Sequence, residues 1–243
     1  MYTYKMTISY DGTRYNGWQR QKNTGATIQG KIEFFLSEFL GYKAEINGAG
    51  RTDAGVHAIM QTASFKCTGF IDTDALMKFF ASCLPKDIAV TSVTLVDERF
   101  HARLNAKGKK YCYRIYTGIY SPVFSRNYVF HHPDALDFNR LVQVSKKLTG
   151  THDFKAYCDN PHMKKSTVRN VWNIEVTGNG DYIDIIFTGD GFLYHMVRHM
   201  VGAMIYYAEN ININIPDMFS FEKSPKEWPL APAKGLTLVE VFY

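Results

Sequence analysis

A chain of 243 residues is long enough for one large domain or for two domains of about 120 residues each, either of which could bury its own core. Its 46% of hydrophobic and 21% of charged residues are ordinary for a globular protein, which excludes a disordered chain. The formal charge of +5 favours a polyanionic partner through long-range attraction, but solvated lysines explain such an excess equally well.

Features of membrane and secreted proteins are missing from the sequence. No apolar run approaches the roughly 18 residues of a membrane span, and no basic start with an apolar stretch behind it marks a leader. The four cysteines are widely spaced, with no CxxC pair, which is typical of buried reduced thiols. We therefore expect a cytoplasmic protein with no membrane attachment.

The first part of the chain predicts the element order βαββαβ. Residues 2–10 alternate small or polar with apolar positions and end at the turn signal Asp11-Gly12, as a strand does. Thr27 can cap a helix in IQGKIEFFLSEFL, whose apolar residues fall at helical spacing, and Gly41 ends it. The remaining elements are a strand at 43–47, a strand at 59–66, a helix that Asp72 or Thr73 starts and Pro85 ends, and a strand at 88–96.

The second part of the chain repeats this order of elements. It predicts, in turn, a strand at 109–117, a helix at 137–148 ended by Gly150, strands at 167–177 and 181–189, a helix at 192–208 and a strand at 236–243. Each half then forms a ferredoxin-like unit, an antiparallel sheet with helices on one face, which RNA-recognition modules use. We expect an α+β protein of two such halves, 1–105 and 106–243, joined into one mostly antiparallel sheet platform.

The segment GAGRTDAGVHA at 48–58 is the most informative part of the sequence. Its three glycines permit backbone conformations that other residues resist, so a ligand could approach the main chain around Asp53. Taken alone, a loop rich in Gly and Asp is more often only a turn. The chain has neither GxxxxGK[ST] nor GxGxxG after a strand, so a nucleotide cofactor is not supported.

GRTDAGVHA resembles the catalytic motif of the TruA family of tRNA pseudouridine synthases, in which the Asp between Thr and Ala is the nucleophile. Further segments are similar to the family in the family's order: YDGTRYNGWQRQ at 10–21, LPKDIAVTSV at 84–93, FHARLNAKGKKYCYRIY at 100–116 and FLYHMVRHMVG at 192–202. The resemblance implies the pseudouridine synthase fold and an isomerase that acts on uridines 38, 39 and 40 of the tRNA anticodon stem-loop. It also implies a homodimer whose two subunits share one tRNA.

The reaction breaks the C1′–N1 bond, turns the base and makes a C1′–C5 bond, which requires a nucleophile and confinement but no redox equivalents. The resemblance implies that Asp53 is that nucleophile, attacking either C6 of the base or C1′ of the ribose. It implies that Arg51 occupies the space left by the extruded base and contacts the RNA backbone, and that Arg198 pairs with the nucleophile and keeps it ionised. Tyr111 would stack on the target base, and Leu236 would line its other side.

Three of these residues also have a purely structural interpretation. Arg51 could be a solvated surface residue, and Arg198 lies on a predicted helix whose apolar stripe is typical of a core. Tyr111 belongs to a strand rich in alternating aromatic residues, which more often pack within a sheet than bind a ligand. The chain also departs from the family at 212–235, which lacks the AGPTAPA-type run that commonly precedes the Gly-Leu pair.

Basic residues cluster in short segments beside these motifs, as contacts to RNA phosphates would require. The candidates for RNA binding are Arg14, Arg20, Lys22, Lys109 and Lys110, with Lys107, Lys164, Lys165 and Arg169 in neighbouring segments. For any single one of them, a solvated face is the alternative.

His195 and His199 stand at the i, i+4 spacing of a helical metal pair. HMVRH, however, lacks the Glu of HExxH and places Arg198 between the two histidines. We therefore expect no metal site, and neither a metal nor an organic cofactor for the reaction.

Two other functions compete with an enzyme that acts on tRNA. A non-catalytic protein built of two RNA-recognition-like units has no RNP1 pattern behind it, and the carboxylate of Asp53 distinguishes the two hypotheses. A small-molecule enzyme on a ferredoxin-like scaffold has no cofactor motif and fits the basic segments poorly. The residues therefore favour the tRNA enzyme.

Overall fold

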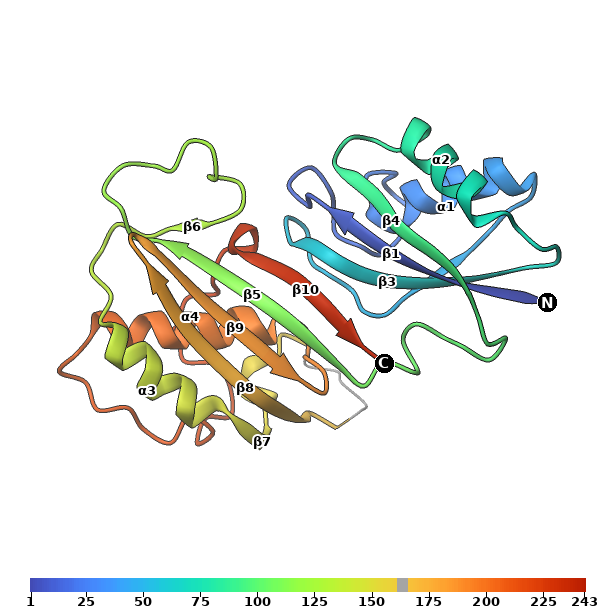
Figure 1. Cartoon of the computed structure of the whole chain (residues 1–243). Coiled ribbons are helices and arrows are strands. Elements are labelled where there is room, and N and C mark those ends of the chain that lie inside the picture. Colours follow the sequence, from blue (N-terminus) through green and yellow to red (C-terminus); the bar gives the residue numbers. More distant parts are fainter. Residues whose placement is uncertain (161–165) are drawn as a thin grey trace. The chain divides into compact units, whose positions relative to one another are not determined.

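In the computed structural model of the chain, residues 1–160 and 166–243 are described. The chain divides into two compact units, of which unit 1 comprises Met1–Lys107 with Thr237–Tyr243, and unit 2 comprises Gly108–Leu236 (Figure 1). In the described part of each unit, a mostly antiparallel sheet is combined with two α-helices, so the expected α+β class is confirmed. None of the described helices has the length and apolar character needed to cross a membrane.

The sheet of unit 1 has the strand order β4-β1-β3-β10, and the short strand β2 also pairs with β3. Its strands are Tyr2–Tyr10 (β1), Ile46–Gly48 (β2), His57–Cys67 (β3), Ile88–Val96 (β4) and Leu236–Phe242 (β10). β1 is antiparallel to both of its neighbours, with Met6 opposite Ala63 on β3 and Val93 on β4. β2 is antiparallel to β3, and β10 runs parallel to it. The strands β1 to β4 thus have the split arrangement of a ferredoxin-like unit.

Helices α1 (Ile28–Leu40) and α2 (Thr73–Cys83) lie on one face of this sheet (Figure 1). The side chain of Thr27 caps α1, and Gly41 ends it at a φ of 74°, where the left-handed region favours glycine. Asp72 caps α2 in the same way. The inward residues of helices and strands form the core, whose fully buried members include Met6, Ile8, Ile28, Ile32, Leu36 and Leu76. These caps and spacings are the ones that the sequence predicts.

The sheet of unit 2 contains strands in the order β5-β9-β8-β7, and β6 pairs in parallel with β5. Its strands are Gly108–Tyr116 (β5), Phe130–His131 (β6), Gly150–Asp153 (β7), Val168–Asn179 (β8) and Tyr182–Gly189 (β9). The four strands β5, β9, β8 and β7 are antiparallel neighbours, with Tyr113 of β5 opposite Ile185 of β9. Both of these residues are fully buried, so this pair marks the core side of the sheet.

Helices α3 (Phe138–Leu148) and α4 (Met196–Glu209) cover one face of this second sheet (Figure 1). α4 is buried along most of its length, and the segment before β10 crosses it. At that crossing, a Cβ on Gly202 would lie 1.8 Å from the carbonyl oxygen of Pro229, so only glycine fits there. Two short 3₁₀ helices complete the described elements, η1 (Lys155–Tyr157) and η2 (Ala233–Gly235).

Every helix and strand predicted from the sequence is present, with differences at the ends and two omissions. α4 begins at Met196 and not at 192, because His195 adopts a left-handed φ of 64° that no α-helix contains. The sequence missed β6 and β7, which are too short to show an alternating pattern. The sequence predicts that the last strand completes the second half, but its residues Thr237–Tyr243 belong to unit 1. The division into halves at 105 and 106 stays a prediction.

Candidate active site

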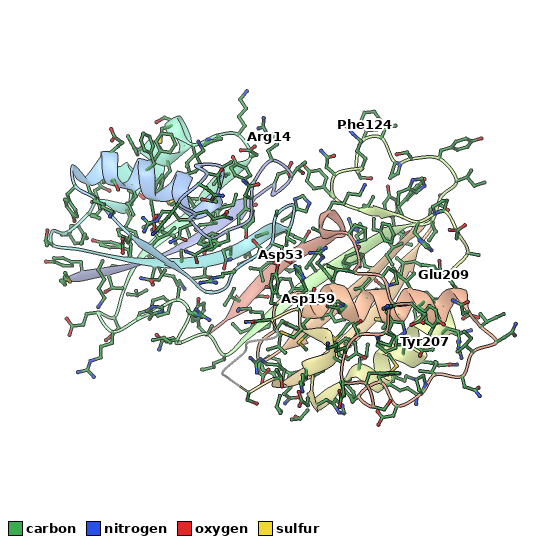
Figure 2. The ribbon with its side chains drawn as sticks, turned by 180° about the vertical axis from the view of Figure 1, so that it is seen from behind. Arg14, Asp53, Phe124, Asp159, Tyr207 and Glu209 are labelled. Carbon is green, nitrogen blue, oxygen red and sulfur yellow. The ribbon has the colours of Figure 1, made fainter. Side chains whose placement is uncertain are left out.

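The motif GAGRTDAGVHA forms the loop that joins β2 to β3 in unit 1. Asp53 is half-buried in this loop, beside exposed Arg51 and buried Thr52 (Figure 2). Gly55 turns the chain at a φ of 79°, and the Val56 N–H donates to the Asp53 carbonyl oxygen at 3.2 Å. Asp53 is thus held in a tight turn and is partly accessible to solvent.

A second segment, residues 11–21, lies against the middle of the loop. Its Gly17 has a φ of 86° and comes so close that a Cβ would lie 2.6 Å from the carbonyl oxygen of Thr52. The next residue, Trp18, donates its N–H to the same oxygen at 3.0 Å. The backbone immediately before Asp53 is therefore fixed by a direct main-chain bond and by a contact that only glycine permits.

The two ends of the loop are held in the same way. A Cβ on Gly12 would lie 2.0 Å from the carbonyl oxygen of Val56, and the Gly12 N–H donates to Nδ1 of buried His57 at 3.1 Å. At the other end, a Cβ on Gly48 would lie 2.5 Å from the indole nitrogen of Trp18. Segment 11–21 thus contacts the loop at both of its ends, at Gly48 where β2 ends and at His57 where β3 begins.

Buried polar side chains support the loop from inside unit 1. The hydroxyls of Tyr10 and Thr52 share a hydrogen bond of 2.8 Å, and the amide of Gln61 donates to the Gly50 carbonyl oxygen at 3.0 Å. Burial raises the pKa of the Tyr10 phenol well above its usual range, so the hydroxyl keeps its proton. Since a buried polar group without a partner costs about 1–3 kcal/mol, these bonds resist displacement of the loop.

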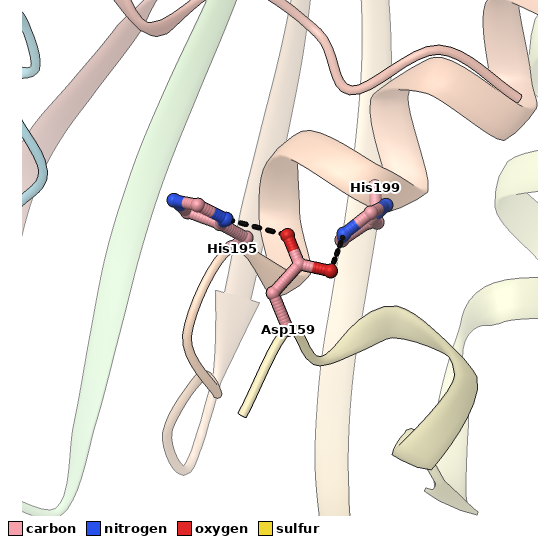
Figure 3. A group of neighbouring side chains, drawn as sticks. All are labelled: Asp159, His195 and His199. Carbon is pink, nitrogen blue, oxygen red and sulfur yellow. Dashed lines mark hydrogen bonds and ion pairs between the residues drawn. The ribbon is translucent and has the colours of Figure 1, made fainter. Parts of the chain in front are cut away.

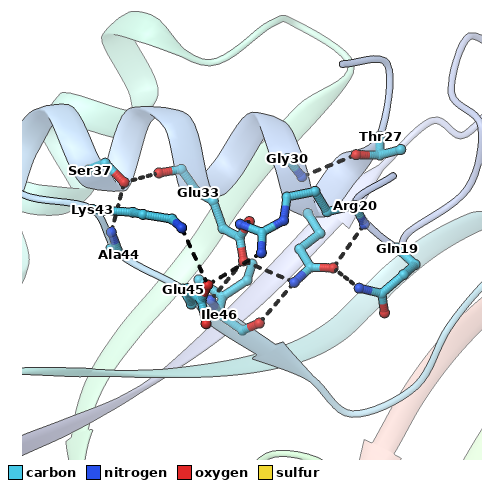
Figure 4. Close-up of polar contacts among 11 residues, drawn as sticks. Gln19, Arg20, Thr27, Gly30, Glu33, Ser37, Lys43, Ala44, Glu45 and Ile46 are labelled. Atoms are coloured by element: carbon cyan, nitrogen blue, oxygen red, sulfur yellow. Dashed lines mark hydrogen bonds and ion pairs between the residues drawn. The ribbon is translucent and has the colours of Figure 1, made fainter. Parts of the chain in front are cut away.

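Arg51 is connected to helix α1 through a chain of side chains. Its Nε donates to Oε1 of Gln19 at 3.1 Å, and Nε2 of Gln19 donates to Oε1 of Gln29 at 2.6 Å. Gln29 is buried on α1, where it donates to the Glu33 carboxylate at 2.9 Å and to the Ile46 carbonyl oxygen at 3.1 Å (Figure 4). An exposed guanidinium group is thus positioned by a buried network.

Two of the three RNA-binding candidates in unit 1 already have carboxylate partners. Arg20 donates to Oε2 of Glu33 at 2.8 Å (Figure 4), and Nε of Arg14 donates to Oδ2 of Asp87 at 3.1 Å. Lys22 is exposed. A phosphate that binds either arginine has to share it with the carboxylate or displace it.

In unit 2, strand β5 carries Lys109, Lys110 and Tyr111 in succession. Tyr111 is 7% exposed, and its ring meets Phe192 edge to face, with 5.3 Å between the centroids. Tyr111 also lies opposite Phe187 of β9. Both lysines are half-buried. The ring of Tyr111 therefore takes part in aromatic packing and exposes only a small part of its surface.

Arg198 lies in the first turn of α4 and is tied to the segment before β10. Its Nε donates to the carbonyl oxygen of Ala231 at 2.7 Å, and the Ala231 N–H returns a bond of 3.3 Å to the Arg198 carbonyl oxygen. The hydroxyl of buried Tyr113 donates to Pro232 in the same segment at 2.9 Å. Leu236 follows at the start of β10 and is 6% exposed. The segment is thus held from two sides.

The predicted site residues are distributed over both units. Asp53 and Arg51 share the loop of unit 1, and Tyr111, Arg198 and Leu236 lie in unit 2. Lys164 and Lys165 lie outside the described residues. The sequence missed the residues that hold the loop, which are Tyr10, Gly12, Gly17, Gln19, Gln29 and Gln61. The YDGTRYNGWQRQ segment drew attention to the first four, but nothing in the sequence marks the last two.

Within the described residues, two groups of side chains have the composition and spacing of metal ligands, Asp159 with His195 and His199, and His132 with Asp134 and Glu209. In the first, Oδ2 of Asp159 lies 2.7 Å from Nδ1 of His195, and Oδ1 lies 2.9 Å from Nε2 of His199 (Figure 3). The sequence shows the histidine pair but not the carboxylate, because Asp159 lies far upstream and joins the pair only in the fold.

Comparisons with known proteins agree with the motifs. A family model described as tRNA pseudouridine synthase matches residues 6–105 and 144–243. The chain is 47% identical over 205 residues to tRNA pseudouridine synthase A of Bacillus sp. (strain KSM-64), with 84% of each protein covered. It is 43% identical over 243 residues to tRNA pseudouridine synthase A 2 of Bacillus anthracis, with 99% of each covered.

The chain also matches a structure described as a crystal structure of a Cbf5-Nop10-Gar1 complex, with a TM-score of 0.42 and 12% identity. That alignment covers 83% of this chain and less than half, 44%, of the other, and so slight a similarity carries no argument about the fold. The family match and the curated relatives each cover most of the sequence. The chain therefore belongs to the family of tRNA pseudouridine synthases.

Proposed function

We propose that this protein isomerises uridine to pseudouridine at positions 38, 39 and 40 of the tRNA anticodon stem-loop, with Asp53 as the nucleophile. Membership of the family and the names of the relatives support the reaction and tRNA as its substrate. The observation that carries the assignment of Asp53 is its position in a loop whose backbone is clamped on both sides, while the residue itself stays accessible.

The proposed chemistry needs no redox partner because the product is an isomer of the substrate. A carboxylate oxygen of Asp53 attacks C1′ of the ribose or C6 of the base, and the C1′–N1 bond breaks. The freed base turns, C5 bonds to C1′, the carboxylate leaves, and the C5 proton is lost while N1 gains one. The demand on the protein is therefore to hold a nucleophile and a detached base in register.

Four other residues complete the proposed site. Arg51 fills the space of the extruded base and contacts the RNA backbone, and its link to Gln19 supports a fixed direction for the guanidinium group. Arg198 pairs with Asp53 and favours its ionised form. Tyr111 stacks on the target base and Leu236 lines the base's other side, in agreement with the small accessible part that each retains.

Basic side chains of both units would hold the backbone of the tRNA. Lys22, Lys109 and Lys110 contact phosphates directly in this proposal, and their exposed or half-buried positions support it. Arg14 and Arg20 contribute while they remain paired with Asp87 and Glu33. The charge of these residues, and not base identity, then sets most of the affinity.

We further propose a cytoplasmic homodimer whose subunits share one tRNA. The loop between β5 and β6 supports self-association, because it exposes the apolar side chains Ile119, Tyr120, Val123 and Phe124, the last of them completely (Figure 2). Exposed apolar patches of this kind mark interaction sites in soluble proteins. Light scattering on the purified chain measures the mass directly, and a monomer at working concentration would contradict this part of the proposal.

Asp53→Asn tests the nucleophile. The amide keeps the size of the side chain but cannot act as the nucleophile, so single-turnover conversion of uridine should fall by at least about 10⁴-fold while tRNA affinity is retained. Asp74→Asn, at an exposed position of α2, is the matched control and should convert tRNA normally. Equal rates for Asp53→Asn and the unaltered protein would refute the assignment. Tight tRNA binding by the unaltered protein without any conversion would favour the non-catalytic RNA-binding alternative.

A further inference from the structure

Three side chains of unit 2 converge at the start of α4, outside the residues of the proposed reaction. Asp159 stands between His195 and His199 and approaches one imidazole nitrogen of each, at 2.7 and 2.9 Å (Figure 3). All three ligand atoms lie within 4.8 Å of one another. Two imidazole nitrogens and one carboxylate oxygen are the protein ligands of a class of zinc sites that keep water in the fourth position.

In the described part of the chain, the imidazole of His199 is buried without hydrogen bonds, although the Asp159 carboxylate lies nearby. The residue is 7% exposed, yet neither of its ring nitrogens has a hydrogen-bond partner of acceptable geometry within the described residues. The Nε2 atom lies 2.9 Å from Oδ1 of Asp159, close enough for an ion pair when the imidazole is protonated, but this contact does not meet the geometric criteria for a hydrogen bond. A cation held by Nε2 and the carboxylate would satisfy both groups.

His195 supplies an independent sign of function in its backbone. Among the described residues, it alone has a positive φ without being glycine, at 64°. This conformation, which costs a non-glycine residue about 1 kcal/mol or more, places its imidazole one turn before His199, facing Asp159. Strained residues of this type cluster at sites that bind or react.

We propose that Asp159, His195 and His199 form a binding site for a divalent transition-metal ion of the zinc type, with water in the fourth position. Ligand atoms about 2.0–2.2 Å from a tetrahedral zinc ion lie about 3.3 Å apart, so the carboxylate must retreat by about half an ångström. Asp159 can do so, because its side chain is 45% exposed and it lies on the segment that follows η1. His195, the residue before α4, and His199, in its first turns, supply the two nitrogens.

Such an ion would clip the segment after η1 to the first turn of α4. Arg198 lies in that turn between the two histidines, so the clip would also restrain the turn on which this arginine is held. Two nitrogen ligands and one oxygen favour Zn²⁺, Co²⁺ or Ni²⁺ over Mg²⁺ and Ca²⁺, which prefer oxygen. The site is independent of the proposed reaction, which needs no metal step.

The test is direct metal binding by the full chain, without a histidine tag and freed of metal by a chelator. Titration with Zn²⁺ in a calorimeter should show saturable binding of one ion per chain, and Co²⁺ should develop the visible absorption of a tetrahedral site. Asp159→Asn and His195→Asn should each weaken binding by more than the 10–100-fold loss that follows removal of an outer hydrogen-bond partner. Asparagine tolerates the left-handed conformation, so the second variant keeps the backbone.

His132→Asn is the matched control, since it removes a ligand from the other candidate group while leaving this one intact. It should bind Zn²⁺ as the unaltered chain does. Zn²⁺ should also raise the unfolding temperature of the unaltered chain but not that of Asp159→Asn, because only a folded-state site stabilises by mass action. Absence of stoichiometric binding, or binding that only His132→Asn removes, would overturn the proposal. The three side chains would then be a bridge of ion pairs alone.

Discussion

Replacing Gly17 by alanine tests whether the clamp on the loop that carries Asp53 matters for turnover. The substitution adds one methyl group at a position whose φ is 86° and whose new Cβ would lie 2.6 Å from the carbonyl oxygen of Thr52. The first penalty acts on the backbone of residue 17 itself, and the second acts on the backbone of Thr52, one residue before Asp53. We therefore expect a loss of stability together with a loss of turnover.

The magnitude has two parts. An L-residue in the left-handed region costs about 1–2 kcal/mol. The new Cβ is also about 0.8 Å short of the 3.4 Å at which ordinary contact begins, and relieving such overpacking typically costs about 1–3 kcal/mol. Gly17→Ala should thus lower the free energy of unfolding by about 2–5 kcal/mol. Because the Thr52 carbonyl belongs to the backbone, no flexible side chain can relieve the contact, and we expect the loop to shift. A misplacement of about 1 Å at a reacting group costs about 10²-fold in rate.

Two control variants separate these contributions. Gly41 has a similar φ of 74°, but a Cβ there meets nothing within 4 Å, so Gly41→Ala should show only the backbone cost of about 1–2 kcal/mol, with normal turnover. Gly25 lies in open space without a positive φ, so Gly25→Ala should be neutral or slightly stabilising, by up to about 1 kcal/mol.

Urea unfolding measures the stability of all three variants, and single-turnover conversion at saturating enzyme measures the rate below the unfolding transition. Gly17→Ala should be the only variant of the three that is slow while still folded. If it matched Gly41→Ala in both stability and rate, the contact with Thr52 would have no role in placing Asp53, and the argument from the clamp would fail.

Two further predictions separate RNA binding from chemistry. The double variant Lys109→Gln with Lys110→Gln should weaken tRNA binding and reduce the slope of log affinity against log salt by about 1 for each phosphate that is no longer neutralised. The control double variant, Lys146→Gln with Lys147→Gln at exposed positions of α3, should leave the slope unchanged. Filter binding across a salt series measures both, and equal slopes would mean that β5 does not face the RNA. Tyr111→Phe keeps the stacking ring but removes the hydroxyl, so it should slow single-turnover conversion by tenfold or more, about 1.4 kcal/mol of barrier, with little change in affinity. A variant that binds weakly and converts normally would reverse this assignment.

Much of the fold is predictable because local signals and tertiary packing agree. Helix α1 begins after Thr27 and ends at Gly41, where capping preferences place its ends, and Asp72 caps the start of α2 in the same way. The apolar alternation of β1 coincides with its burial pattern, since a central strand faces the core with every second residue. Where such agreement exists, the sequence predicts an element to within a few residues.

The elements that were missed or misplaced depend on long-range contacts. β6 has two residues and β7 four, so neither can show a period, and both exist only because β5 and β8 offer hydrogen-bond partners. The start of α4 is displaced by the backbone of His195, whose left-handed conformation no propensity scale predicts. Asp159 could not be connected with the histidines for the same reason, because the contact arises from folding and not from spacing.

The site shows a different limit of sequence reasoning. Local chemistry makes GAGRTDAGVHA only a glycine-rich turn, and it was the family resemblance that singled out Asp53. The structure explains why YDGTRYNGWQRQ accompanies that motif in this chain. Gly12 and Gly17 have no room for a Cβ because the loop lies against them, and Trp18 occupies the space that a side chain at Gly48 would need. A change in either segment therefore alters the surface that the other contacts. The two stretches, though separated along the chain, form one structural unit around Asp53, the proposed nucleophile. The proposed chemistry requires such a unit because the base rotates during the reaction. The carboxylate of Asp53 contributes to the rate only if the backbone that carries it stays fixed while the base turns.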